Sequence, residues 1–196
     1  LPVEASDIRD QLGVKDLDIG SIKAIVIVNP TYFGVARDMG DICGLAAEMG
    51  IPVIVDEAHG TLFSFSDSMP PSAIKYGAHL VVHGAHKTTK AFTQTGMLHV
   101  TKKGQERFPH LSKNVQEALR LVQSTSPSYL LLASLENAAK DLYTDSEWVN
   151  TTVKLGNSLA DLLAEVPGIK VQVPGLKTQK CGTGADIKGK LLWDPG

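Results

Sequence analysis

The sequence predicts an α/β fold in which helices flank a mainly parallel sheet. Short β-rich apolar runs alternate with helical patterns in the first half of the chain, and this alternation is typical of strand–helix–strand units. Residues 22–28 form a nearly continuous apolar run that ends at Asn29-Pro30, which predicts a strand buried on both faces of the sheet. The pattern becomes more helical and changes near residue 145. We therefore expect one domain over 1–145 and the start of a smaller α+β domain over 146–196.

The other elements of the first half follow from residue spacing. Residues 38–49 predict a helix, because apolar side chains recur there at three- or four-residue intervals and Gly50 is a typical helix stop. Further strands are expected over 51–56, 79–83 and 97–100.

The second half predicts three helices and two short strands. A helix is expected over 112–123, and the next begins at Ser126-Pro127, where serine suits the N-cap and proline the first turn. Residues 144–147 fit a capping box that starts a third helix. Strands are expected over 169–173 and 190–193. The stripe of the third helix that we expect to be buried comprises Trp148, Thr152, Leu155, Leu159, Leu162 and Val166.

The composition is that of an ordinary globular protein. The chain has 196 residues, 43% of them hydrophobic and 20% charged, which argues against disorder. A net charge of −2 offers no basic surface for nucleic acid, and no apolar run has the length of a membrane helix. Cys43 and Cys181 belong to no metal-binding motif, so we expect a reducing compartment, the cytoplasm. The ends of the sequence look cut, and we expect a fragment of a longer chain.

Three polar clusters follow predicted strands. They are residues 29–32, residues 56–59 and residues 83–87. In open α/β sheets, ligands bind beyond the carboxyl ends of parallel strands. Three clusters at one edge of one sheet therefore predict a functional site.

Two other interpretations of these clusters are weaker. Residues 56–59 read Asp-Glu-Ala-His, which is also a helicase motif, but that chemistry requires an upstream phosphate loop. The nearest match, residues 184–190, lies downstream and is followed by Leu191 in place of a hydroxyl residue. A metal site would draw on His59, His79, His83 and His86. No second cluster supplies ligands at a known spacing, so we expect no metal.

Asp56 and Lys87 suggest a more specific hypothesis, a site for pyridoxal phosphate. A lysine at a strand end can form a Schiff base with pyridoxal phosphate, and a carboxylate against the pyridine nitrogen keeps that ring protonated as an electron sink. Asp56 ends one predicted strand and Lys87 follows another. The spacing alone leaves open that Lys87 is an ordinary solvated loop lysine.

Several linked motifs resemble one enzyme family. They are Asn29–Gly34, Val55–Gly60, His86–Thr88, Thr93–Val100 and Ser124–Tyr129, in the order and spacing of the pyridoxal-phosphate-dependent ornithine/lysine/arginine decarboxylases. The resemblance covers residues 20–145 well and the rest more loosely. It implies the large domain of a fold type I enzyme, the aspartate-aminotransferase fold, with pyridoxal 5′-phosphate as cofactor.

The resemblance also implies roles for particular residues. Asp56 would pair with the pyridine nitrogen, and Lys87 would carry the cofactor as a Schiff base. Ala58 would lie against one face of the ring, His86 near the phosphate, and His59 in the pocket. Thr125 and Ser126 would reach a phosphate across a dimer interface.

Gly84 departs from the family pattern. The family usually has a serine three residues before the lysine, where it binds the phosphate, and this chain has Gly84 there. A backbone N–H could substitute for the lost hydroxyl; the alternatives are weaker phosphate binding, compensation by another group, or a degenerate relative of the family. The family's phosphate-cradling loop and the ring stacked on the cofactor's other face come from upstream of Leu1. We also expect the family's substrate-selecting C-terminal part to be absent from this sequence.

The resemblance implies decarboxylation of ornithine, lysine or arginine to the corresponding amine and carbon dioxide, by a homo-oligomer. One alternative is an aminotransferase or lyase of the same fold. Another is a non-catalytic paralogue that assembles with an active chain, which the glycine at position 84 would suit.

Overall fold

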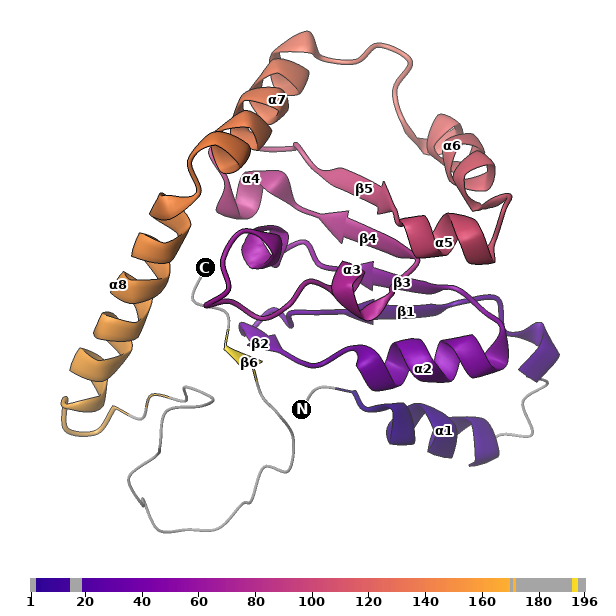
Figure 1. Ribbon diagram of the computed structural model, residues 1–196, viewed down its shortest axis with the longest axis horizontal. Helices are drawn as coiled ribbons and strands as arrows, with labels where there is room; N and C mark the ends of the chain where they lie inside the picture. The colour runs from indigo at the N-terminus through magenta and orange to yellow at the C-terminus, as the bar shows by residue number, and fades with distance from the viewer. Residues whose placement is uncertain (1–2, 15–18, 170, 172–191, 194–196) are drawn as a thin grey trace.

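The computed structural model describes residues 3–14, 19–169, 171 and 192–193, and its centre is a four-stranded sheet with the strand order β1-β3-β4-β5 (Figure 1). A second, two-stranded sheet joins β2 to β6 in antiparallel fashion. The strands are β1 (Ile25–Val28), β2 (Val35–Ala36), β3 (Val53–Asp56), β4 (Leu80–His83), β5 (Met97–Val100) and β6 (Leu192–Trp193).

Helices flank the main sheet and form most of the second half of the described chain. The α-helices are α1 (Ala5–Val14), α2 (Gly40–Met49), α3 (Ala73–Tyr76), α4 (Ala85–Thr88), α5 (Lys102–Arg107), α6 (Leu111–Val122), α7 (Tyr129–Thr144) and α8 (Glu147–Ala164). Two 3-10 helices, η1 (Ile19–Ser21) and η2 (Thr61–Ser64), lie between them.

The predicted, mainly parallel sheet is confirmed. β1 pairs with β3 and β3 with β4 in parallel, so the carboxyl ends of these three strands share one edge. β5 runs antiparallel to β4. The connection between them contains only the short helix α4 and returns along the neighbouring strand, whereas a parallel pair needs a longer crossover.

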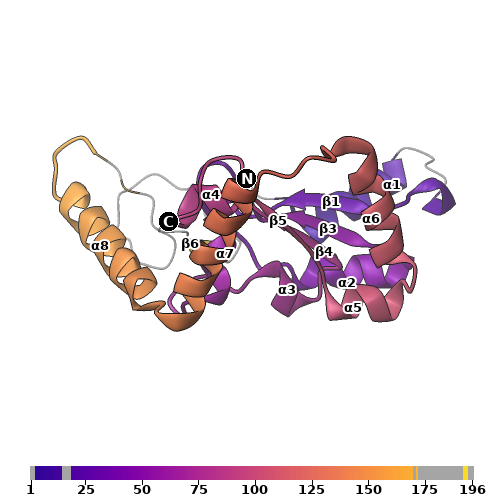
Figure 2. The ribbon, with the colours of Figure 1, turned by 90° about the horizontal axis from the view of Figure 1, so that it is seen from above.

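The main core lies on one face of the sheet, where α2, α3 and α5 are gathered (Figure 2). Val53, Val55 and Val81 are fully buried there against Ile42 and Leu45 of α2. α2 ends at Gly50, as expected, with a φ of 68° that suits glycine.

The prediction that residues 22–28 are buried on both faces is wrong for the described chain. Val26 and Val28 of β1 are 65% and 57% exposed, while Ile25 is buried on the core face. Among the described residues, nothing covers these two valines. An apolar run shows that a strand can be buried on both faces, but burial also requires a covering element.

α8 buries a different face from the one predicted. Val149, Val153 and Ala160 are buried, whereas Leu159 and Leu162 of the predicted stripe are more than half exposed. Val149 and Val153 pack in a second core with residues of η2, and the rest of α8 runs away from the sheet (Figure 1). The helix therefore buries only the side that meets η2.

The helix caps differ in detail from the prediction. Ser128, not Ser126, caps α7, because its Oγ accepts a hydrogen bond from the N–H of Leu131. Ser126 belongs to the preceding turn, where its N–H donates to Oγ of Ser124. Before α8, the N–H of Glu147 donates to Asp145, and no reciprocal capping box forms.

Some expectations fall outside the described residues. Of the strand predicted over 169–173, the structure describes only residues 169 and 171, and of the strand predicted over 190–193 it describes only residues 192 and 193. The phosphate-loop match at 184–190 lies entirely outside the described residues. The domain boundary near residue 145 stays a prediction. Within the described residues, no helix combines the length and apolarity needed to cross a membrane.

Candidate active site

The three predicted clusters meet at one edge of the sheet. The N–H of Asn29 donates to the carbonyl of Asp56 at 2.9 Å, which ties the end of β1 to the end of β3. The N–H of Glu57 donates to the carbonyl of Val82 at 2.9 Å, which ties β3 to β4. The parallel pairing thus brings the three strand ends together, as the sequence predicted.

Lys87 and His59 are in direct contact at this edge. Nζ of Lys87 lies 3.1 Å from Nε2 of His59. Lys87 belongs to α4 and is exposed, and its backbone N–H donates to the carbonyl of Gly84 at 2.9 Å. A lysine ammonium can only donate, so Nε2 of His59 accepts and its proton lies on Nδ1.

Asp56 closes a local turn at the end of β3. Its Oδ1 accepts a hydrogen bond from the N–H of Ala58 at 3.0 Å, which is an Asx turn. Within the described residues, Oδ2 has no hydrogen-bond partner. The half-buried carboxylate is thus oriented through one oxygen while the other remains available.

Gly84 leaves no room for a side chain. A Cβ there would lie 2.8 Å from the carbonyl oxygen of Ala58 and 3.1 Å from Cδ of Lys87. The N–H of Gly84 donates to that same Ala58 carbonyl at 3.2 Å. The expectation that this N–H replaces the family's serine hydroxyl is therefore not met, because the N–H is already used within the chain.

His86 is held by the loop before β5. Its Nδ1 lies 2.7 Å from the carbonyl oxygen of Thr95, which also accepts the backbone N–H of His86. A carbonyl only accepts, so Nδ1 carries a proton and Nε2 is the ring atom left for a ligand. Two residues after His86, Oγ1 of Thr88 is buried and has no partner among the described residues.

The segment after β1 contributes an aromatic side chain. Asn29 is buried, and its amide bonds to the main chain of Arg37 through both its oxygen and its nitrogen. Tyr32 is 83% exposed, and its ring centroid lies 6.3 Å from that of His59 in an edge-to-face arrangement. Asn29 thus shapes the loop, and Tyr32 borders the Lys87–His59 pair.

Thr125 and Ser126 are not brought to this site within the chain. They lie in the exposed connection between α6 and α7 (Figure 1). In the described part of the chain, no contact joins them to Asp56 or Lys87. A role across a dimer interface stays a prediction.

Sequence analysis missed Glu57, the most deeply buried charged residue at the site. Its carboxylate is fully buried and accepts hydrogen bonds from Oγ of Ser72 at 2.6 Å and from the N–H of Ala73 at 2.7 Å. Nε2 of His83 lies 2.8 Å from the same carboxylate, and Nδ1 of His83 lies 3.1 Å from Nε2 of His99. The available signal was an acidic residue at the end of one strand and histidines on the two neighbouring strands.

The histidines do not converge as a metal site would require. His79 lies at the other end of β4, where its Nδ1 accepts the N–H of Val53 and its ring packs on Phe108. Burial, together with Lys103 and Arg107, lowers the pKa of His79. Among the described residues, no group of three potential ligands is arranged for a metal ion.

Comparison with known proteins identifies the family. Residues 5–181 match the sequence profile described as Orn/Lys/Arg decarboxylase, major domain. The chain belongs to the Orn/Lys/Arg decarboxylase family. The resemblance read from the sequence is confirmed.

Curated members of the Orn/Lys/Arg decarboxylase family are longer than this chain. An arginine decarboxylase of Bacillus subtilis (strain 168) is 41% identical over 149 residues, which are 75% of this chain and 29% of the relative. An arginine decarboxylase of Bacillus cereus is 38% identical over 145 residues, which are 74% of this chain and 30% of the relative. The chain thus spans about three tenths of the length of these relatives.

Solved structures show the same fold. A methionine gamma lyase from Micromonospora echinospora, CalE6, matches with a TM-score of 0.63 and 20% identity, over 88% of this chain and 43% of its own. An alanine–glyoxylate aminotransferase from Nostoc sp. matches with a TM-score of 0.58 and 13% identity, over 88% of this chain and 47% of its own. The domain therefore has the fold of the pyridoxal-phosphate-dependent fold type I enzymes, and the Orn/Lys/Arg decarboxylase family supports that cofactor.

Proposed function

We propose that the full protein decarboxylates a basic amino acid with pyridoxal phosphate, and that arginine is its first candidate substrate. The observation that carries the proposal is the convergence of Asp56, His59 and Lys87 at the carboxyl edge of the sheet in a member of this family. Arginine leads because four relatives at 35–41% identity are named arginine decarboxylase.

The geometry of these residues fits the cofactor. The exposed amine of Lys87 can bond covalently to an aldehyde, and its contact with His59 gives it a proton acceptor. The carboxylate of Asp56 has one oxygen without a partner among the described residues. A carboxylate in this position can hold a pyridinium nitrogen in its protonated form.

Each neighbouring residue serves the same site in the proposal. Ala58 and Gly84 present small surfaces, so the ring can approach the backbone. His86 presents Nε2 to the phosphate, since its Nδ1 is held by Thr95.

The reaction divides its work between the cofactor and the protein. Bound pyridoxal phosphate supplies an electron sink for the bond to the departing carboxylate. Lys87 and His59, 3.1 Å apart, form the pair that can hold and return a proton at the reacting carbon.

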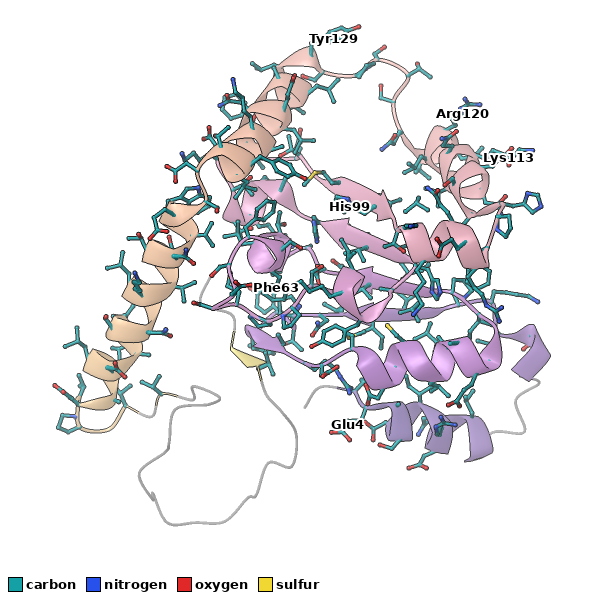
Figure 3. All side chains as sticks on the ribbon, in the orientation of Figure 1. Glu4, Phe63, His99, Lys113, Arg120 and Tyr129 are labelled. Carbon is teal, nitrogen blue, oxygen red and sulfur yellow. The ribbon has the colours of Figure 1, made fainter. Side chains whose placement is uncertain are left out.

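We also propose a homo-oligomer with an interface near Thr125 and Ser126. Leu121 and Val122 at the end of α6 are 87% and 81% exposed. Tyr129, 80% exposed, projects from the start of α7 (Figure 3). Exposed apolar surface of this kind is typical of a protein interface. The buried, free Cys43 fits the cytoplasmic location proposed from cysteine use.

The test is carbon dioxide release by the full-length protein supplied with pyridoxal phosphate and with arginine, lysine or ornithine. Lys87→Ala should abolish release. Lys90→Ala is the matched control, because the contacts of the Lys90 amine within the described residues are an exposed ion pair with Asp141 and a distant ring contact with Trp148. Such a pair is worth about 0–1 kcal/mol, so the control should keep near-normal activity.

The products decide between the alternatives. An amine and carbon dioxide support decarboxylation, whereas an oxo acid would assign the protein to aminotransfer. No reaction with any of the three substrates would favour the non-catalytic paralogue.

A further inference from the structure

We propose that Glu57, His83 and His99 form a buried positioning network that holds Asp56 and Lys87 in register for the cofactor. Glu57 directly follows Asp56, and His83 lies four residues before Lys87 in the sequence. The inference rests on the proposed function, because it assumes that these two residues hold the cofactor.

The network crosses four elements behind the candidate site. Glu57 reaches the start of α3 through Ser72 and Ala73, and it reaches β4 through His83. His83 reaches β5 through His99, which is a residue of that strand and is labelled in Figure 3. Side chains of successive residues in an extended segment point to opposite faces of the sheet, so the side chains of Asp56 and Glu57 lie on opposite faces at the end of β3.

Because the network is buried, water cannot replace a hydrogen-bond partner that is lost from it. The side chain of Glu57 is 0% exposed and that of His83 is 6% exposed. A buried carboxylate needs several donors, and here it has Ser72, Ala73 and His83. Removing its oxygens would leave the hydroxyl, the N–H and the ring N–H unpaired in the interior.

The hydrogen bonds run in one direction. Glu57 as a carboxylate only accepts, so His83 donates from Nε2 and its Nδ1 has a lone pair. That lone pair accepts from Nε2–H of His99. Burial is the main cause that lowers the pKa of His99, His83 adds to that shift, and Glu57 opposes it.

This order of donors and acceptors predicts different outcomes for two substitutions of Glu57. In Glu57→Gln, the amide oxygen can keep the N–H of Ala73, and the amide nitrogen can donate to Nε2 of His83. His83 then donates from Nδ1 to His99, and the hydroxyl of Ser72 turns to accept. The contacts survive with reversed direction. In Glu57→Leu, the hydrogen bonds to Ser72, Ala73 and His83 are all lost.

The test compares cofactor binding by three variants of the full-length protein. We expect Glu57→Leu to bind pyridoxal phosphate at least about tenfold more weakly, since buried donors lose their acceptor. Glu57→Gln should stay within about threefold of the unmodified protein, since Ser72, Ala73 and His83 each keep a hydrogen bond to residue 57. Val149→Ala, in the separate core of α8 and η2, should lower the thermal unfolding midpoint without changing affinity.

A spectroscopic measurement distinguishes positioning from a general loss of stability. The pH at which bound cofactor changes its absorbance depends on where Asp56 and Lys87 sit. We expect this midpoint to shift in Glu57→Leu and to stay in place in Glu57→Gln and Val149→Ala. Hydrogen exchange of the cofactor-free protein should show lost protection at Ala73 in Glu57→Leu alone.

Three results would overturn the network. Equal affinity and equal absorbance profiles for Glu57→Leu and the unmodified protein would show that Glu57 does not position the site. A loss in Glu57→Gln as large as in Glu57→Leu would show that charge, not hydrogen-bond geometry, matters. Unchanged exchange at Ala73 would remove the link to α3. If the unmodified protein forms no adduct at Lys87, the proposed function itself fails, while the exchange result still judges the network.

Discussion

The carbonyl oxygen of Ala58 lies 2.8 Å from the position that a Cβ on Gly84 would occupy. The same oxygen accepts the N–H of Gly84 at 3.2 Å, so the turn after β3 and the turn after β4 are in backbone contact. This contact explains the glycine at a position where the family resemblance implies serine. The space beside the Ala58 carbonyl, and not only the need for a phosphate-binding side chain, determines which residue can occupy position 84.

Restoring the serine is therefore expected to weaken the site. In Gly84→Ser the new Cβ must displace the backbone of Ala58 or the side chain of Lys87, and overpacking of this kind costs about 1–3 kcal/mol. We expect weaker binding of pyridoxal phosphate and a lower thermal midpoint in the full-length protein. The measurement is a cofactor titration followed by absorbance.

Gly84→Ala provides the matched control, because it adds the same Cβ without a hydroxyl. Equal losses in the two variants would assign the effect to space. Tighter binding in Gly84→Ser than in the unmodified protein would contradict this account, because the hydroxyl would then be a phosphate ligand as in the family.

A second prediction concerns the covalent attachment of the cofactor. Borohydride converts a lysine–aldehyde Schiff base to a stable secondary amine, and peptide mapping then locates it. In the full-length protein we expect the pyridoxyl group on Lys87, whose Nζ contacts His59. The side chain of Lys90 is 65% exposed, and its amine pairs with Asp141 and not with His59, so Lys90 should remain unlabelled.

The outcome with Lys87→Ala completes this experiment. No specific label should remain in that variant. A label that moves to Lys90, or one that persists at several lysines, would show non-specific reaction with exposed amines and would count against Lys87 as the cofactor lysine.

The sequence predicted the strands and the site edge well for a physical reason. Buried strands of a parallel sheet need uninterrupted apolar runs, and polar residues can follow only where each strand ends. That rule located Asp56 and Lys87 at one edge, and the structure confirms that their strands meet there. It could not give the direction of β5, which depends on the path of the connection after α4.

Partners far apart in the sequence were harder to predict. The amphipathic pattern of α8 indicated a buried stripe through Leu159, yet the helix buries Val149, because η2 meets only that side. Glu57 was passed over for a similar reason. Its donors come from α3 and β4, and no local pattern links Ser72 to His83.

A third prediction concerns pH and stability. Burial, with Lys103 and Arg107 nearby, lowers the pKa of His79 below its ordinary value of 6.5. Below pH 6.5 the unfolded chain binds a proton that the folded chain resists. The contribution of His79 is thus complete above that pH and is lost as the pH falls toward the lowered pKa.

His79→Asn should reduce this acid sensitivity. Asparagine does not titrate, and its oxygen can accept the N–H of Val53 that now bonds Nδ1 of His79. The measurement is the thermal midpoint from pH 7.5 down to about pH 5. His110→Asn is the control, because His110 is exposed. Identical slopes for both variants and the unmodified protein would contradict the assignment.

A fourth prediction separates the shape of Asp56 from its charge. Asp56→Asn keeps an oxygen that can accept the N–H of Ala58, so the turn after β3 should persist and the thermal midpoint should change little. Asparagine cannot hold a pyridinium proton as a carboxylate does. We therefore expect the full-length variant to bind the cofactor yet lose at least about a hundredfold in turnover, since electrostatic stabilisation of this kind is typically worth that much. Steady-state kinetics with arginine and a cofactor titration measure the two effects. Near-normal turnover with intact binding would show that the charge of Asp56 is not required.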